Sequence, residues 1–312
     1  MATTWLCDTL SNKIFLMALL LAHAGLAGAQ ATVPATVPAA ASVAPAAVAA
    51  PIEAPRTGAL APAAGPWALV RTLRLPNPGA ASLDRRGGLY VADADNNVRQ
   101  FGPEGLPLNT YAPPQPGHVA ELEAWNFTNT LVFYDDRQQL VLLDRFLTPL
   151  SELRLADYLD GTVRAATLAP DNHIWLLDES TLALREFDPG TLRLVQSTPL
   201  DLLIGRTRPD FRFIRQYQNN IYLVDKTTGI YVFDNLGSYK KKLSLPGLST
   251  VGFRGDELYY LAGNELRFFH LYNLTERTVA LPSDAGALCQ VLVGEKFAYL
   301  FTAQGVAVYR LP

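Results

Sequence analysis

The sequence predicts an all-β fold, a six-bladed β-propeller, from three observations. A unit of roughly forty residues recurs six times along the chain, which is the signature of a repeat architecture. Each unit reads as three short strands followed by a fourth, with turn-forming residues between them. The final unit lacks its fourth strand, and a matching segment stands ahead of the first unit.

Every unit has a second strand rich in aliphatic and aromatic residues, and this strand is the clearest register mark. The second strands are expected at 89–93, 131–135, 174–178, 221–225, 258–262 and 298–302. A third strand follows each of them, at 98–101, 141–144, 184–188, 230–234, 266–269 and 306–309. Asn, Asp and Gly between the two strands favour tight turns, so each pair is expected to form a hairpin.

The ends of the repeat region indicate a closed ring. Radial packing of the units covers both faces of each sheet and leaves only short edges, which is the propeller solution. The last unit stops after its third strand, whereas residues 68–75 end like the fourth strands that precede Pro246 and Pro282. We therefore expect residues 68–75 to form the outermost strand of the last blade. Five or seven blades are the alternatives if the weak second unit is cut differently.

The front of the chain predicts export. Residues 1–29 read as a signal peptide, because Lys13 precedes an apolar run and Ala27-Gly28-Ala29 forms a small-x-small cleavage pattern. An uncleaved anchor is the alternative. Residues 30–66 are an Ala/Pro-rich segment that we expect to be a disordered linker, and 67–312 are the propeller domain. We expect a periplasmic or secreted protein of a bacterial cell envelope, which is not an integral membrane protein after cleavage.

Composition excludes some functions. The formal net charge is −3, with 26 Lys and Arg against 29 Asp and Glu, which argues against a nucleic-acid partner. The histidines of the expected mature chain, His118, His173 and His270, fall at unrelated positions of the repeat, so we expect no zinc site. The chain also has no Gly-x-Ser-x-Gly elbow and no phosphate-binding glycine loop, and we expect no catalytic residues.

An Asp ends four of the second strands. One interpretation is a ring of carboxylates for a cation. The other is a turn cap in which each carboxylate accepts hydrogen bonds from nearby backbone amides. Two units lack the acid and have Ala262 or Thr302 instead, and second strands lie away from a propeller axis, so we favour the cap. The four residues are Asp93, Asp135, Asp178 and Asp225.

The densest cluster of polar and aromatic residues runs from Gly205 to Tyr217. Arginine suits bidentate capture of a carboxylate or phosphate, and aromatic neighbours could hold a ring or a sugar face. The alternative is a surface loop with Phe211 and Phe213 packed between blades. The candidate ligand-binding residues are Arg206, Arg208, Asp210, Arg212 and Arg215.

The first strand of the second unit provides the other candidate site. Strand alternation places Glu121, Glu123 and Trp125 on one side. If that side faces the channel, these residues could bind a cation or a sugar. Otherwise they contribute to the packing between blades and to the rim.

Residues 81–105 resemble an NHL repeat, through the turn Asp84-Arg-Arg-Gly87, the strand Tyr90-Val-Ala-Asp93 and the turn at Asn96-Asn97. Looser copies lie at 166–190 and 213–237. The chain as a whole is similar to uncharacterised exported propeller proteins of Bacteroidota. The resemblance implies six blades but little about activity, because NHL propellers serve as protein-binding, RNA-binding and enzymatic scaffolds.

We expect an exported binding or scaffold module for a protein, peptide or glycan of the cell envelope, without a cofactor. The alternative is a propeller enzyme of the lactonase or sugar-dehydrogenase type, which would hold calcium or a quinone in its channel. The expected channel strands offer acid and amide groups for it, namely Asp84, Glu121 or Glu123, Asn126 and Asp210. A lyase of the zinc- and calcium-dependent amidating type would need a histidine triad that the sequence lacks. A purely structural role is the third class.

Overall fold

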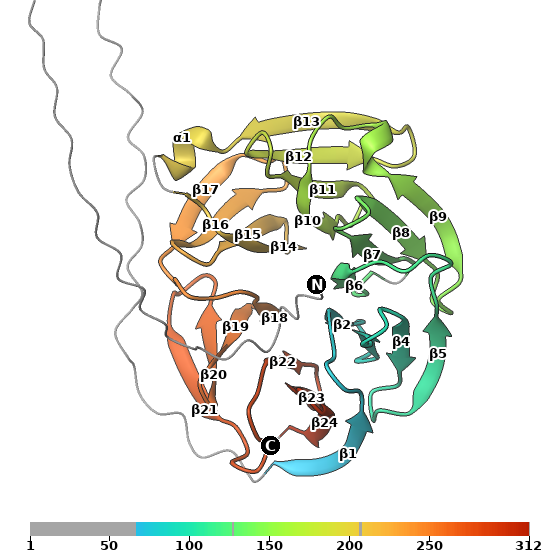
Figure 1. The fold of residues 1–312 in the computed structure, drawn as a ribbon. Coiled ribbons are helices and arrows are strands. Elements are labelled where there is room, and N and C mark those ends of the chain that lie inside the picture. Colours follow the sequence, from blue (N-terminus) through green and yellow to red (C-terminus); the bar gives the residue numbers. More distant parts are fainter. Residues whose placement is uncertain (1–66, 127, 206–207, 312) are drawn as a thin grey trace, which may run out of the picture. The chain divides into compact units, whose positions relative to one another are not determined.

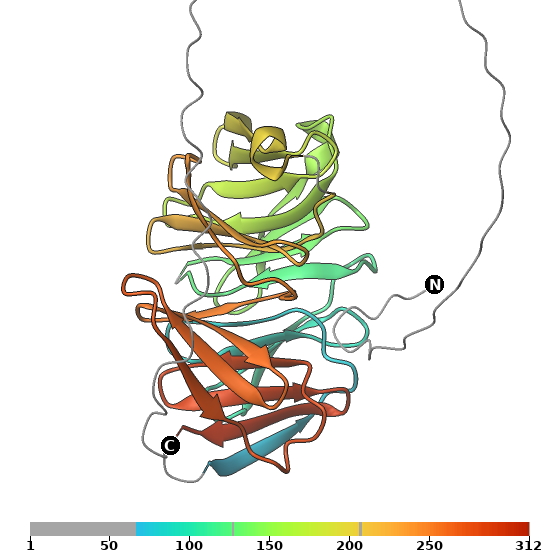
Figure 2. The same cartoon turned by 90° about the vertical axis from the view of Figure 1, so that its left-hand side faces the viewer.

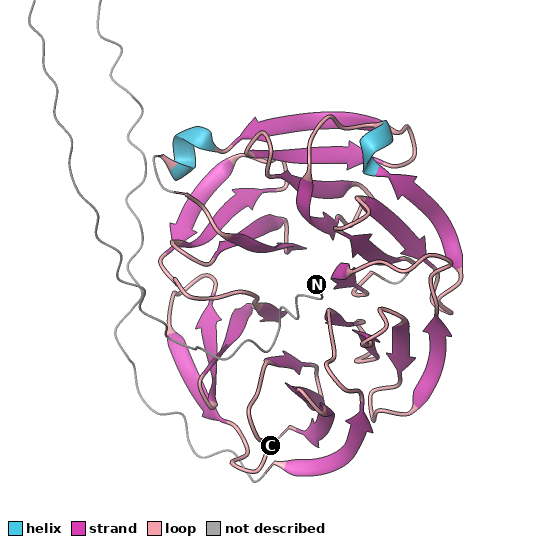
Figure 3. Ribbon diagram, viewed as in Figure 1, coloured by secondary structure: helices cyan, strands magenta, loops and turns pink. Residues whose placement is uncertain are grey.

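The computed structural model describes residues 67–126, 128–205 and 208–311. The described chain is nearly all β (Figure 3). Six four-stranded antiparallel sheets lie around a common axis (Figure 1). The fold is therefore a six-bladed β-propeller, and the prediction of fold class and blade number is confirmed. The expected signal peptide and linker, 1–29 and 30–66, lie outside the described residues.

The first three blades follow one another along the chain, each running outward from the axis. Blade 1 comprises β2 (Ala81–Leu83), β3 (Leu89–Ala92), β4 (Val98–Phe101) and β5 (Pro107–Tyr111). Blade 2 comprises β6 (Val119–Glu123), β7 (Thr130–Tyr134), β8 (Gln139–Leu143) and β9 (Pro149–Arg154). Blade 3 comprises β10 (Val163–Leu168), β11 (Ile174–Asp178), β12 (Ala183–Asp188) and β13 (Arg193–Pro199).

The other three blades repeat this order. Blade 4 comprises β14 (Phe211–Tyr217), β15 (Asn220–Asp225), β16 (Gly229–Asp234) and β17 (Tyr239–Leu243). Blade 5 comprises β18 (Gly252–Arg254), β19 (Glu257–Ala262), β20 (Glu265–His270) and β21 (Glu276–Ala280). Blade 6 comprises β22 (Gln290–Val293), β23 (Phe297–Thr302), β24 (Gly305–Arg310) and β1 (Ala68–Arg74). Two single turns, η1 (Leu155–Asp157) and α1 (Asp201–Ile204), lie at blade junctions. No helix of the described residues has the length and apolar character that a membrane crossing requires.

Blade 6 closes the ring with strands from both ends of the propeller. Strand β1 pairs antiparallel with β24, with Leu73 opposite Val306 and Arg71 opposite Val308. The two strands lie side by side in both views (Figures 1 and 2). The prediction that residues 68–75 complete the last blade is confirmed. Tyr299 adds a polar link, because its hydroxyl lies 2.6 Å from the carbonyl oxygen of Gly87 in blade 1.

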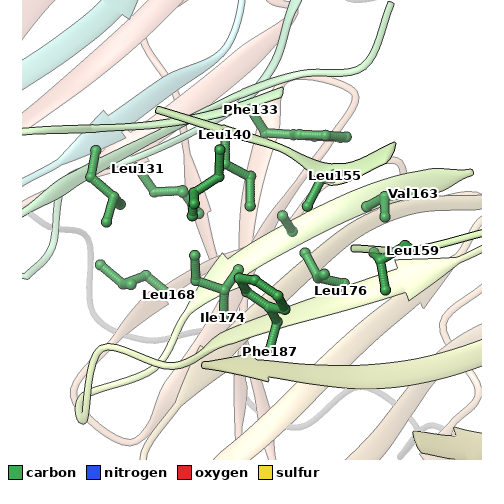
Figure 4. Close-up of a cluster of buried hydrophobic side chains, with 13 residues drawn as sticks. Leu131, Phe133, Leu140, Leu155, Leu159, Val163, Leu168, Ile174, Leu176 and Phe187 are labelled. Carbon is green, nitrogen blue, oxygen red and sulfur yellow. The ribbon is translucent and has the colours of Figure 1, made fainter. Parts of the chain in front are cut away.

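The hydrophobic core is divided among the interfaces between blades. Between blades 2 and 3, side chains such as Leu131, Phe133, Ile174 and Phe187 interdigitate without solvent contact (Figure 4). Strands β7, β8 and β11 are buried on both faces, which explains why they read as unbroken apolar runs. This packing of sheet against sheet holds each blade against its neighbours around the ring.

Glycine is required where two blades bring a third strand close to the outermost one. Gly305 begins β24 with φ +150°, and a Cβ there would lie 2.0 Å from the carbonyl oxygen of Leu73. Gly229 begins β16 with φ +118°, and its Cβ would lie 2.2 Å from the carbonyl oxygen of Leu243. No other residue type fits such an approach without moving the outermost strand.

Replacement of Gly305 by Ala should therefore weaken ring closure. We expect Gly305→Ala to lower the free energy of unfolding by more than about 2 kcal/mol, because the methyl group displaces β1. Gly263→Ala is the matched control, since Gly263 has φ +63° but open space around its Cβ position. It should cost about 1 kcal/mol. Urea unfolding of the two variants measures the difference, and equal losses would contradict the closing role of Gly305.

Candidate functional site

The structure brings four of the predicted site residues together at the centre of the ring, namely Glu121, Glu123, Trp125 and Arg215. Thr167, which was not predicted, joins them. Glu121 and Glu123 on β6 and Thr167 on β10 form, with Arg215 on β14, a group that we call the hub cluster. Trp125 extends it just after β6, donating a hydrogen bond from Nε1 to Glu123 Oε1. The cluster joins blades 2, 3 and 4, and the exposed fractions of Glu121 and Glu123 are only 6% and 1%.

The carboxylate of Glu123 is occupied by groups of the protein itself. Its Oε2 accepts hydrogen bonds from Thr167 Oγ1 at 2.8 Å and from the backbone N–H of Leu168 at 3.0 Å. Its Oε1 accepts from Trp125 and lies 3.6 Å from Arg215 Nη1. Burial raises the pKa of Glu123, and the attraction of Arg215 and the hydrogen bonds offset only part of that effect. These contacts leave Glu123 little capacity for a ligand.

Glu121 connects blade 2 to blade 4. Its carboxyl accepts a hydrogen bond from the backbone N–H of Ile214 on β14. Burial raises the pKa of Glu121 to about 8, although the nearby Arg215 lowers it and Glu123 raises it further. At neutral pH this carboxyl is therefore largely protonated inside the hub.

Side chains of neighbouring blades also accept hydrogen bonds from N–H groups on the free edges of several innermost strands. Each innermost strand has a neighbour on one side only, so the N–H groups of its other edge need acceptors from elsewhere. Polar side chains of other blades supply them across short distances. The bonds are Ala124 N to Ser82 Oγ at 3.0 Å, Gln216 N to Thr167 Oγ1 at 3.0 Å, Val119 N to Asn96 Oδ1 at 2.9 Å and Val293 N to Tyr259 Oη at 2.9 Å. The structure thus places Glu121 and Glu123 in the packing between blades.

The other predicted arginines do not join this cluster. Arg212 forms an ion pair with Asp210, with Nε 2.7 Å from Oδ1 and Nη2 2.9 Å from Oδ2. Arg208 is exposed, and Arg206 lies outside the described residues. Phe211 and Phe213 are buried in two different core clusters, as the alternative interpretation expected. A ligand-binding role for these residues stays a prediction.

The Asp residues at the ends of the second strands cap turns. Asp93 Oδ1 accepts the backbone N–H groups of Asp95 and Asn97, each at 3.0 Å. Asp178 and Asp225 repeat this arrangement at their own turns. Burial raises the pKa of Asp93, but hydrogen bonds from Arg99 and the turn amides outweigh it and hold the pKa below its ordinary value. The turn-cap interpretation is confirmed for these three residues.

One group of side chains in blade 3 has the composition of a metal site. Ligand atoms of Asp171, His173 and Glu186 all lie within 4.8 Å of one another. The contact between His173 Nδ1 and Glu186 Oε1 is 2.9 Å, and this hydrogen bond raises the pKa of His173. Gln196 donates to the second oxygen of Glu186 at 2.9 Å. The hydrogen bonds among His173, Glu186 and Gln196 therefore account for this arrangement within the protein itself.

A groove among blades 5, 6 and 1 offers an accessible surface. It has a volume of ≈1020 Å³ and is lined by residues of blades 5, 6 and 1, and we call it the basic groove. Its aromatic and aliphatic lining includes Trp67, Leu266, Phe268, Val279, Phe297 and Tyr299. Its cationic lining residues are Arg86, Arg254, Arg277, Lys296 and Arg310, against the two carboxylates of Glu104 and Glu295. The sequence contains no signal for this site, because its residues come from three blades and form no local motif.

The cations of the basic groove differ in how strongly the protein engages them. Arg277 is held by Glu257 through two contacts of 2.6 Å, and its Cζ lies 3.7 Å from the centre of the Phe268 ring. Arg310 lies over Phe297, with 6.0 Å between its Cζ and the ring centre. Arg86 and Lys296 are exposed and form no side-chain ion pair within the described part of the chain. Arg254 donates a hydrogen bond from Nη2 to the backbone carbonyl oxygen of Glu295 at 3.3 Å. Arg86 and Lys296 are thus the two cations of the groove that the protein engages least.

Comparison with known proteins finds similar folds but no matching family. No protein-family model and no curated protein sequence matches the chain. Among solved structures, the WD40 domain of Pan2 from Neurospora crassa is similar, with a TM-score of 0.58 and 10% identity over 79% of this chain and 95% of that one. A streptogramin B lyase gives a TM-score of 0.56 and 12% identity, covering 78% of this chain and 96% of the lyase. Raptor from Chaetomium thermophilum gives 0.57 and 10%, covering 80% of this chain and 30% of Raptor.

These likenesses show the propeller fold alone, because the identities are low. The proteins named include a WD40 domain as well as a lyase, so the fold does not decide between binding and catalysis. The resemblance to NHL repeats stays a prediction.

The hub cluster predicts a large effect of a small substitution. Thr167→Val removes the hydroxyl that donates to Glu123 and accepts from the backbone N–H of Gln216, while keeping the side-chain shape. We expect a loss of about 1–3 kcal/mol in the free energy of unfolding, because two buried groups lose a partner. Thr110→Val, on the exposed outermost strand of blade 1, should change it by less than about 0.5 kcal/mol. Denaturant unfolding that gave equal values would contradict the capping role.

Glu121 predicts a specific pH dependence. Between the ordinary carboxyl range and the raised folded-state pKa of about 8, the folded protein keeps a proton that the unfolded chain has released. The free energy of unfolding should therefore fall as the pH rises through that window, by at most about 1.4 kcal/mol for each pH unit. Glu121→Gln should remove this fall, since glutamine keeps an acceptor but does not titrate. Parallel stability curves for wild type and variant would refute the assignment, and Glu104→Gln serves as an exposed control.

Proposed function

We propose that the protein is an exported propeller that binds a segment of a protein or peptide in the basic groove. The observation that carries this proposal is the groove itself, which combines apolar walls with cations that the protein does not engage. The hub cluster, by contrast, is closed by hydrogen bonds within the protein. Pockets that bind ligands typically combine an apolar lining with a few polar groups in this way.

The lining of the groove favours binding over catalysis. The described residues that line it include no His, Cys, Ser or Thr. Arginine and aromatic side chains are enriched at the centres of protein interfaces. We therefore place the enzyme alternative second.

The proposal of export rests on the sequence of the first residues. A signal peptide at 1–29 and a linker at 30–66 would deliver the propeller to the bacterial periplasm or beyond the cell. A partner in the cell envelope follows from that location. Glycans are the alternative ligand class, because a partly exposed aromatic ring such as that of Trp67 can also stack on a sugar.

The proposal predicts groove-dependent peptide binding. Peptides that bind the full chain can be selected from a random phage-displayed library, and their affinity measured for two tryptophan variants. Val279→Trp adds bulk to the groove wall, whereas Leu202→Trp adds the same ring to an 88% exposed position on α1. We expect Val279→Trp to weaken the selected peptides by about ten-fold or more and Leu202→Trp to leave them unchanged.

Circular dichroism should show that both variants keep the wild-type fold. If the selected peptides bind Val279→Trp as tightly as the wild type, the groove is not the binding site. If the library yields no binder, or if defined glycans bind where peptides do not, the proposal of a peptide ligand fails.

A further inference from the structure

We propose that the ligand of the basic groove is an acidic peptide segment, an extended stretch in which Asp or Glu side chains alternate with apolar ones. This inference rests on the proposed function and adds the chemical class of the partner. It depends on three features of the groove, which are its charge, the state of its cations and the arrangement of its walls.

The positive charge of the groove is a local property. The whole chain has more acidic than basic residues, 29 against 26, whereas the groove has five cationic side chains and two carboxylates. A concave surface with low-dielectric walls focuses such a charge and attracts ligands of the opposite sign. The groove therefore selects for anions on an otherwise acidic protein.

Four of the five cations can meet a ligand without first breaking an ion pair. Arg86 and Lys296 have no side-chain ion pair among the described residues, Arg254 donates to the backbone carbonyl oxygen of Glu295, and Arg310 contacts the ring of Phe297. The guanidinium groups can hold a carboxylate by two parallel hydrogen bonds, and a lysine ammonium adds a compact charge. Arg277 differs, because Glu257 already neutralises it.

The walls of the groove explain why the ligand should also be apolar. The partly exposed apolar lining residues are Val279 of blade 5 and Trp67 and Leu311 of blade 6, whereas Leu266 and Phe268 are buried beneath the surface. Arg86 and Lys296 come from blades 1 and 6. An extended chain points successive side chains to opposite sides, so one side can face the apolar wall and the other the cations. A volume of ≈1020 Å³ lies at the upper end of the range for ligand pockets and leaves room for several residues.

The same surface disfavours a polyphosphate. Nucleic acid binding requires a continuous positive stripe that neutralises many phosphates. Here Glu104 and Glu295 interrupt the lining, and both are exposed. A peptide with a few spaced carboxylates fits this mixture better than a backbone with one charge at every step.

Three matched octapeptides test the inference with the full chain. Each repeats the pattern X-Ala-X-Leu twice, with X as Glu, Gln or Lys, and its affinity is measured by fluorescence anisotropy. The Glu peptide should bind about ten-fold more tightly than the Gln peptide and should weaken when salt is raised from about 50 to about 500 mM. The double variant Arg86→Gln and Lys296→Gln should weaken the Glu peptide about ten-fold and leave the Gln peptide unchanged.

The control removes the same charge elsewhere. Arg154→Gln with Arg193→Gln neutralises two exposed arginines on the outermost strands β9 and β13, and it should leave the affinity for the Glu peptide within about two-fold. Equal losses in both double variants would mean unspecific attraction and would overturn the inference. So would tighter binding of the Gln or Lys peptide, of single-stranded oligothymidine, or of vesicles that contain phosphatidylserine.

The outcomes separate this inference from the proposed function. If display against the full chain yields groove-dependent peptides without acidic residues, the acidic class is wrong and the binding groove stands. If the selected peptides ignore Val279→Trp, the groove itself is wrong and the acidic class fails with it.

Discussion

The architecture depends on one constraint, which is that the innermost strand of every blade is also the edge of a sheet. Its inward N–H groups have no neighbouring strand, and a buried amide without an acceptor costs about 1–3 kcal/mol. Side chains from other blades supply the missing acceptors, among them Ser82, Thr167 and Tyr259. Blades 2, 3, 4 and 6 therefore depend on a neighbouring blade for hydrogen bonds as well as for packing.

This constraint also explains the two buried glutamates. A carboxyl group can accept several hydrogen bonds, so Glu123 satisfies Thr167 and Leu168 at once. Ionised acids pay a large cost in such a place, and the raised pKa of Glu121 expresses that cost. Arg215 reduces it by lying beside both carboxyls. Charged residues on an innermost strand thus serve the fold here, although the same residues would be read from the sequence as binding groups.

The strands, their hairpins and the closure of the ring could be predicted, because they follow from local periodicity and from one missing strand at the end of the repeat. The caps at Asp93, Asp178 and Asp225 could also be predicted, since a turn and the carboxylate that caps it lie within a few residues of each other. The surroundings of Glu121 could not be predicted, because alternation gives the side of a strand but not the blades that meet there. The basic groove has no local signal in the sequence, since Arg86, Arg277 and Lys296 come together only in the closed ring. The dense arginine cluster near Arg212 does have such a signal, but Arg212 forms an ion pair with Asp210 of the same segment.

The pairing of β1 with β24 has a consequence for how the protein reaches its native state. Among the described strands β1 comes first along the chain and β24 comes last, so nearly the whole length of the propeller separates the two partners. Contacts of such long range slow folding, because the entropy of closing the loop is lost before the contact forms. Blade 6 therefore gains its fourth strand, and the ring its closure, only after β24 has been synthesised and meets β1.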